Sequence, residues 1–156
     1  MSDPMLAIEE ILAAWRAAFP EETLDAETLP LDETVITLAP AHVVPAIRIL
    51  VEQFGVTHLS TITGDDAGNG LRLLYHLWAG HSITLRTLLP YEHPHIATLT
   101  DLIPGAAFYE REVWEMLGVV FDGLPDPQPL LMPDDWQGEH PLRRTKDEDR
   151  AESPTS

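Results

Sequence analysis

Residues 57–89 alternate between apolar and polar side chains, and this pattern restricts the possible folds more than any other feature of the chain. In the clearest segment, 71–78, every second side chain is apolar: Leu71, Leu73, Tyr75 and Leu77. A period of two is typical of a β-strand with one buried face. Short glycine-containing turns separate this segment from strand-like segments at 57–63 and 82–89. The pattern therefore predicts a three-stranded meander.

Two helices and one more strand are predicted before the meander. One apolar stripe at helical spacing ends at Pro20, and a second runs from residue 41 to Phe54 and ends at Gly55. Residues 21–33 are acidic and are expected to be irregular, whereas residues 34–38 read as a short strand. The predicted fold class is α+β, with helices packed on one face of a small mixed or antiparallel sheet.

Prolines are frequent in the last third of the chain. One helix fits between them, from about Gly105 to Leu117, and Gly118 is its expected stop. The remaining prolines disfavour regular structure, so the chain should continue as an extended segment. The predicted domains are an α+β domain over residues 1–118, an extended docking segment over 119–144 that lies on a surface of this chain or of a partner, and a disordered polar tail over 145–156.

The charge of the chain excludes several classes of function. The 156 residues carry 26 acidic and 9 basic side chains, a formal net charge of −17, and Lys146 is the single lysine. Phosphate contacts need clustered cations, so binding to nucleic acid or to an anionic lipid surface is not expected. The acidic ends of the chain can serve solubility or can complement a basic partner, and the residues alone leave both readings open.

Cysteine content and hydropathy add further limits. The chain has no cysteine, so it holds neither a disulfide nor a cysteine-ligated cluster. No apolar run reaches the roughly 20 residues of a membrane-spanning helix. The start of the chain lacks the basic residues of a secretory signal. These features favour an acidic, water-soluble domain.

Three patterns suggest chemistry, and each has a simpler explanation. His93 and His95 next to Glu92 could bind a metal, but successive side chains around a proline point in different directions. The glycine-rich segment 64–70 has no lysine and lies between strands, so it reads as a turn rather than a phosphate site. His76 and His81 flank a predicted hairpin and are expected to cap or solvate its turn. A carboxylate pair for hydrolysis would come from a helix that carries Glu110, Glu112 and Glu115.

The most informative segment is this glutamate-bearing helix, EREVWEMLGVVF at residues 110–121. Arg111 lies between Glu110 and Glu112, shortly before Trp114, and Arg111 can also reach Glu115 at a spacing of four residues. A guanidinium that is forked to carboxylates can be sustained on a half-buried helix. The cluster is therefore either a structural clasp within the chain or a docking surface, and the residues alone do not decide between them.

The same helix, followed by LLMPDDW at 130–136 and HPLRR at 140–144, resembles the C subunit of proton-pumping NADH–quinone oxidoreductase. A similar subunit occurs in membrane-bound nickel–iron (NiFe) hydrogenases. The resemblance implies a non-catalytic structural subunit in the cytoplasm-facing arm of the complex, peripheral to the cell membrane. It implies docking on the large quinone-site subunit, which is related to NiFe hydrogenase large subunits, beside iron–sulfur subunits.

The resemblance also implies which residues matter. No cofactor is expected in this chain, whereas the parent complex should carry iron–sulfur clusters and a quinone site, with FMN and NADH, or with ferredoxin. Glu110, Arg111 and Glu112 would hold the helix and the following segment together, with Trp114 and Glu115 beside them. The residues that would anchor the extended segment on the partner are Pro133, Asp135, Trp136, His140, Pro141 and Arg143.

Three of the departures from the family pattern concern the partner surface. Leu124, Gln128 and Pro129 stand where the family has a histidine and two arginines, so the partner surface must differ there. These departures leave two alternatives to the assignment of the chain to a quinone-reducing complex. One is the equivalent subunit of a membrane-bound hydrogenase, and the other is a soluble acidic adaptor or assembly factor with the same fold.

Overall fold

The computed structural model describes residues 8–22, 25–29 and 33–124. In chain order its elements are α1 (Ile8–Ala18), β1 (Asp25–Leu29), β2 (Glu33–Thr37), α2 (Pro40–Phe54), β3 (His58–Asp66), β4 (Leu71–Trp78), β5 (Ser82–Leu89), β6 (His95–Ala97), α3 (Ala106–Leu117) and β7 (Val120–Asp122).

Five strands form a mixed sheet in the order β1-β2-β5-β4-β3. The meander of β3, β4 and β5 is antiparallel, as expected, and β2 joins β5 in parallel. The parallel pair needs a crossover, and α2 together with the first two meander strands provides it. The short strands β6 and β7 form a separate parallel pair.

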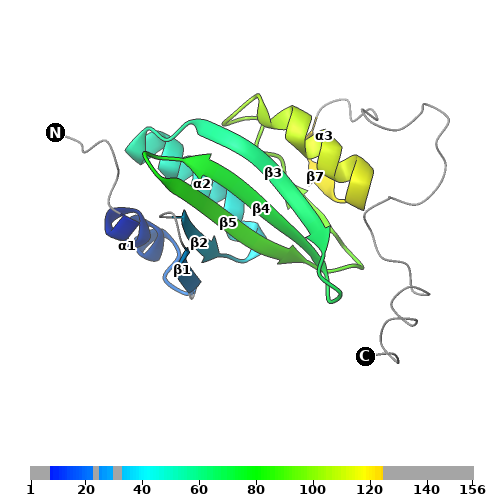
Figure 1. Ribbon diagram of the computed structural model, residues 1–156, viewed down its shortest axis with the longest axis horizontal. Helices are drawn as coiled ribbons and strands as arrows, with labels where there is room; N and C mark the ends of the chain where they lie inside the picture. The colour runs from blue at the N-terminus through cyan, green and yellow to red at the C-terminus, as the bar shows by residue number, and fades with distance from the viewer. Residues whose placement is uncertain (1–7, 23–24, 30–32, 125–156) are drawn as a thin grey trace.

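The helices lie on one face of the sheet, which confirms the predicted α+β architecture (Figure 1). In β4 the side chains of Leu71, Leu73, Tyr75 and Leu77 are buried while their neighbours are not. Helix α2 buries Val43, Ala46, Ile47 and Leu50 on the side that contacts the sheet. Helix α1 packs on α2, where the indole Nε1 of Trp15 donates a 3.0 Å hydrogen bond to the carbonyl of Ala46.

Local sequence explains where the helices end. Pro40 begins α2, where its missing N–H costs nothing. Gly55 then ends α2 in the left-handed conformation, at φ 69°, and donates its N–H to the helix carbonyls. Gly118 ends α3 in the same way, at φ 81°. Both stops were predicted from the glycines.

Two local expectations were wrong. Residues 25–29 form the edge strand β1 rather than irregular chain, and β1 pairs antiparallel with β2. Its acidic residue Glu27 reaches across the sheet to Arg86, which compensates the charge that made the segment look unsuited to a strand. His76 does not cap a turn but lies within β4, and His81 is in the turn but buried.

The predicted extended segment begins as part of the domain. Val120–Asp122 is strand β7, and the side chains of Val119 and Phe121 are buried in the core. Residues 125–144 of that segment and the predicted tail lie outside the described residues. Within the described ranges, no helix is long and apolar enough to cross a membrane.

Candidate functional site

Helix α3 carries the charged cluster and is held against β3 by small and apolar residues. Ala106, Val113 and Leu117 are buried along one side of the helix. At the point of contact β3 has Gly64, whose missing side chain lets Leu117 approach, since a Cβ there would lie 2.7 Å from Leu117 Cδ1. The close approach fixes α3 in position over the edge strand.

Glu110 points into the protein and is a structural clasp. Its side chain is fully buried, at 0% exposure. Its carboxylate accepts hydrogen bonds of 2.6 Å from the hydroxyl of Thr98 and 2.6 Å from the backbone N–H of Leu99. Burial raises the pKa of Glu110, and these two hydrogen bonds partly oppose that rise. Through these two hydrogen bonds, Glu110 joins α3 to the loop after β6.

The buried surroundings of Glu110 include Tyr75 of β4. The Tyr75 hydroxyl is fully enclosed and has no hydrogen-bond partner among the described residues. Burial raises the pKa of Tyr75 far above its ordinary value, and the nearby charge of Glu110 raises it further. Tyr75 therefore remains a neutral phenol and contributes to the core as a large ring.

Further hydrogen bonds connect the loop that Glu110 holds to the two-stranded sheet of β6 and β7. The N–H of Thr98 donates to the carbonyl of Asp122 at 2.9 Å, and the N–H of Val120 donates to the carbonyl of Pro94 at 2.9 Å. His95 Nδ1 also lies 2.9 Å from a carboxylate oxygen of Asp122. The described chain up to Asp122 is thus fixed by backbone hydrogen bonds to the loop that Glu110 holds.

The other members of the cluster occupy different surroundings. Glu115 is buried, and neither Glu115 nor Arg111 is a free charge. Trp114 is partly exposed and packs against the core with part of its surface. Glu112 is partly exposed and has no partner among the described residues. Glu112 and Glu115 therefore lie in different environments, although the sequence places them on one helix.

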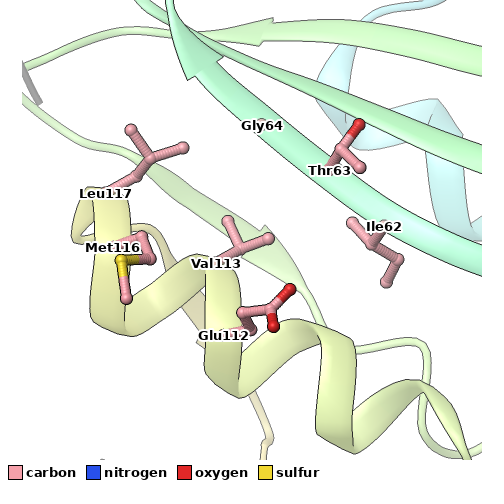
Figure 2. Close-up of a pocket in the computed structure, with 7 residues that line it drawn as sticks. All are labelled: Ile62, Thr63, Gly64, Glu112, Val113, Met116 and Leu117. Carbon is pink, nitrogen blue, oxygen red and sulfur yellow. The ribbon is translucent and has the colours of Figure 1, made fainter. Parts of the chain in front are cut away.

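A groove lies beside Glu112, between β3 and α3 (Figure 2). It has a volume of about 270 Å³ and is lined by Ile62, Thr63, Gly64, Glu112, Val113, Met116 and Leu117. Apart from the carboxylate of Glu112 and the polar group of Thr63, these side chains are apolar. Sequence reasoning missed this groove because it is formed by residues about 50 positions apart.

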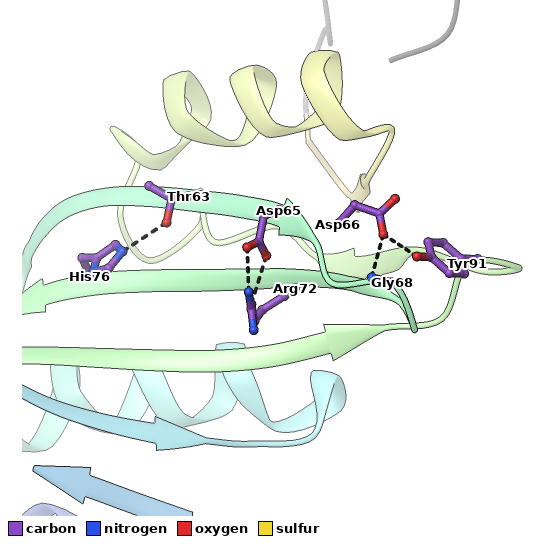
Figure 3. A network of polar contacts seen from close by, with 7 residues as sticks. All are labelled: Thr63, Asp65, Asp66, Gly68, Arg72, His76 and Tyr91. Carbon is purple, nitrogen blue, oxygen red and sulfur yellow. Dashed lines mark hydrogen bonds and ion pairs between the residues drawn. The ribbon is translucent and has the colours of Figure 1, made fainter. Parts of the chain in front are cut away.

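The sheet face opposite the helices carries a polar network that the sequence also did not reveal (Figure 3). Arg72 forms a bidentate pair with Asp65 on the neighbouring strand, at 2.9 and 2.6 Å. His76 lies between two hydroxyls, 3.1 Å from Thr63 and 3.0 Å from Thr84. Asp66, at the end of β3, belongs to a separate set of contacts: it accepts from the hydroxyl of Tyr91 and from the N–H of Gly68. The alternation predicted a polar face, but strand register decides the partners.

The histidine pair His93 and His95 stacks rather than converging on a common point. The two rings are 4.0 Å apart and almost parallel, at 3°. Parallel rings direct their nitrogen lone pairs side by side, and His95 is already engaged with Asp122. Over residues 8–22, 25–29 and 33–124, no group of three or more metal-ligating side chains comes together.

The remaining predicted site residues lie outside the described part of the chain: Pro133, Asp135, Trp136, His140, Pro141 and Arg143. Their role in docking stays a prediction. The same holds for Gln128 and Pro129, two of the positions that depart from the family pattern. The third, Leu124, is described and packs part of its side chain against the core.

Known proteins resemble the chain over most of its length. The C subunit of NADH-quinone oxidoreductase from Roseiflexus castenholzii is 34% identical over 142 residues, which cover 86% of this chain and 80% of that protein. The corresponding C subunit from Acidothermus cellulolyticus is 44% identical over 82 residues, covering 51% of this chain and 42% of that one. The C/D subunit of NADH-quinone oxidoreductase from Citrobacter koseri is 45% identical over 75 residues, which cover 46% of this chain and 12% of that protein.

Solved structures share the fold. The trypsin-resistant fragment of Nqo5 superposes with a TM-score of 0.65 at 26% identity, over 76% of this chain and 98% of the fragment. A chain of the membrane-bound sulfane sulfur reductase, an archaeal respiratory membrane complex, has a TM-score of 0.67 at 24% identity, over 86% of this chain and 82% of that one. The family described as "Respiratory-chain NADH dehydrogenase, 30 Kd subunit" matches residues 36–152, and the chain belongs to that family.

Proposed function

We propose that this chain is a non-catalytic structural subunit of a proton-translocating NADH (or ferredoxin)–quinone oxidoreductase, which docks on the large quinone-site subunit of the cytoplasm-facing arm. The observation that carries the proposal is the family match over residues 36–152, which spans both the folded domain and the proline-rich segment after it. A relative that covers most of both chains is the C subunit of an NADH-quinone oxidoreductase.

Two further observations support a large neighbouring subunit as the partner. In the C/D protein of Citrobacter koseri, the matched region makes up 12% of the chain, so that protein joins a region like this one to a much larger remainder. In the present structure, Glu110 and the β6–β7 pair secure the residues that directly precede segment 125–144. A fixed starting point suits a segment that must reach a defined surface, because less freedom is lost on binding.

The partners of the chain are accordingly the other subunits of a respiratory complex, and the association with the membrane comes through them. We expect the iron–sulfur clusters, the quinone site and FMN with NADH, or ferredoxin, in those subunits rather than in this one. The predicted anchors on the large subunit are the six residues of the C-terminal segment named above, and Arg111 would support them from α3.

Purification from native membranes tests the proposal. A tag at the N-terminus, at the other end of the chain from the docking segment, allows recovery of the intact complex in mild detergent, and mass spectrometry identifies what comes with it. The expected result is a large quinone-site subunit with iron–sulfur subunits and NADH- or ferredoxin-linked quinone reduction. A NiFe hydrogenase subunit with hydrogen-linked activity would assign the chain to the hydrogenase type instead. Recovery of the chain alone from the soluble fraction would favour the adaptor and contradict the proposal.

A further inference from the structure

We propose that the groove between β3 and α3 receives an extended, basic segment of a partner subunit, which adds as a strand to the free edge of β3. This inference rests on the proposed function, since it assumes that the chain works inside a complex. It concerns a surface on the folded domain, distinct from the C-terminal segment.

The first observation is the edge itself. Strand β3 is last in the sheet order, and in the described part of the chain it pairs only with β4. It is nine residues long, so a long row of backbone donors and acceptors faces outward. An unpaired edge of this kind is a template for an added strand, and peptide-binding domains use it in that way.

The second observation is an apolar groove along that edge. Ile62, Val113, Met116 and Leu117 line it, and of these four Met116 is the side chain that stays partly exposed, while Leu117 fills the space beside Gly64 (Figure 2). Its volume of about 270 Å³ is below the roughly 300–1,000 Å³ typical of small-molecule sites. A groove of this size suits the side chains of a bound segment better than a cofactor.

Helix and strand run alongside each other, which gives the groove a length that fits extended chain. Val113 and Leu117, one helical turn apart, line it together with Ile62 and Gly64, which are two strand residues apart. Four residues of helix rise about 6 Å and two residues of strand about 6.6 Å, so these helix and strand positions are spaced by nearly equal distances along the groove. One turn before Glu112, Phe108 is 56% exposed and adds an apolar side chain to the surface of α3.

The negative charge at the groove indicates which kind of partner segment would bind there. Glu112 stands at the groove with no partner among the described residues, and the chain carries a net charge of −17. A second copy of the chain would bring the same negative charge to the same edge, so self-association is opposed. A segment with apolar side chains at alternate positions and a lysine or arginine opposite Glu112 satisfies both the groove and the charge.

Photo-cross-linking within the assembled complex tests the occupant. A photoreactive phenylalanine analogue replaces Met116 in the groove, and the same residue replaces Arg16 on exposed α1 as the control. The expected result is a cross-link from position 116, and not from position 16, to a basic extended segment of another subunit. A cross-link to residues 125–156 of the same chain, a cross-link to a second copy, or no cross-link in an assembled complex would overturn the proposal.

A charge reversal provides an independent test. Glu112→Lys should reduce the amount of partner retained on the tagged chain after a salt wash by roughly tenfold, because the added cation repels the basic segment. Glu52→Lys reverses an exposed charge on α2, away from the groove, and should change retention little. Equal retention of both variants would contradict the proposal. If the complex assembles normally but the groove is unoccupied, only this inference fails; if no complex forms with the unmodified chain, the proposed function fails as well.

Discussion

The hydroxyl of Thr98 lies 2.6 Å from a carboxylate oxygen of Glu110, and this hydrogen bond joins the middle of α3 to the loop after β6. The second carboxylate oxygen accepts the backbone N–H of Leu99 at 2.6 Å. Because Thr98 is also bonded to Asp122 of β7, one buried side chain coordinates the helix, the loop and the start of the C-terminal segment. The first glutamate of the charged cluster is therefore internal, and only the second faces outward.

Replacing Glu110 by Gln should destabilise the chain by about 1–3 kcal/mol at neutral pH, because an amide group would present a donor where the carboxylate accepts from a buried N–H. Urea unfolding of the isolated chain measures the change. Glu9→Gln, on the exposed side of α1, is the control and should leave the free energy of unfolding nearly unchanged. Equal effects of the two substitutions would show that Glu110 is not a clasp.

The raised pKa of Glu110 predicts how this difference depends on pH. The folded chain holds the proton more tightly than the unfolded chain, whose carboxyl has its ordinary value of 4.5. The stabilisation from the protonated form is fully present below 4.5 and is lost as the pH rises through the folded pKa. Wild type should therefore gain stability relative to Glu110→Gln as the pH falls from 7 towards 4.5. If the difference in stability between wild type and Glu110→Gln stayed constant over that range, burial would not raise the pKa of Glu110.

Gly64→Ala tests the contact between β3 and α3. A Cβ would lie 2.7 Å from Leu117 Cδ1, so α3 must shift, and we expect a loss of about 1–3 kcal/mol in the free energy of unfolding. Combining the change with Leu117→Ala removes the overlap. The double variant should consequently lose less free energy of unfolding than the sum of the losses in the two single variants. A double-mutant cycle measured by urea unfolding would show this difference. Strict additivity would indicate that the two residues do not limit each other.

His76 should make the domain less stable in mild acid. Burial lowers the pKa of His76 from its ordinary value of 6.5, with a smaller opposing effect of Glu33. The unfolded chain then binds a proton near pH 6.5 while the folded chain does not, so stability falls as the pH drops from 6.5 through the folded pKa. His76→Gln should lose less stability between pH 7.5 and 5.5 than wild type does. His58→Gln, on the exposed start of β3, serves as the control and should retain the wild-type slope.

Arg111→Ala should weaken assembly of the complex. Arg111 is partly buried in the cluster and is not a free charge, so its removal leaves a neighbouring group without compensation. Arg16→Ala removes an exposed charge from α1 and is the matched control. Co-purification from membranes compares the two variants. If both assemble as well as the unmodified chain, the docking role inferred for Arg111 is wrong.

Amide exchange separates the two parts of the proline-rich segment. Val120 and Leu124 donate backbone hydrogen bonds of 2.9 and 3.0 Å within the domain, so their amides should be protected in the isolated chain. Amides in residues 125–144 should exchange more slowly in the complex than in the isolated chain, because the partner would bury them. Identical exchange of residues 125–144 in the two states would contradict docking by this segment.

Local patterns of residues determined the main elements of this protein. The alternation in Leu71–Trp78 specifies a half-buried strand because successive side chains point to opposite faces, and Gly55 and Gly118 end helices because they accept positive φ at low cost. The family of the chain was also evident from the ordered motifs after residue 110. All of these signals come from neighbouring residues.

Tertiary structure decided those features that depend on contacts between residues far apart in the sequence. Segment 25–29 becomes a strand because β2 pairs with it and Arg86 compensates Glu27. Glu110 and Glu112 look equivalent in the sequence, yet only Glu110 meets the buried Thr98 hydroxyl and the N–H of Leu99. Desolvating a carboxylate is tolerable only where such donors are already in place. The packed fold, rather than the local sequence, therefore determined which charge became a clasp and which remained available at the groove.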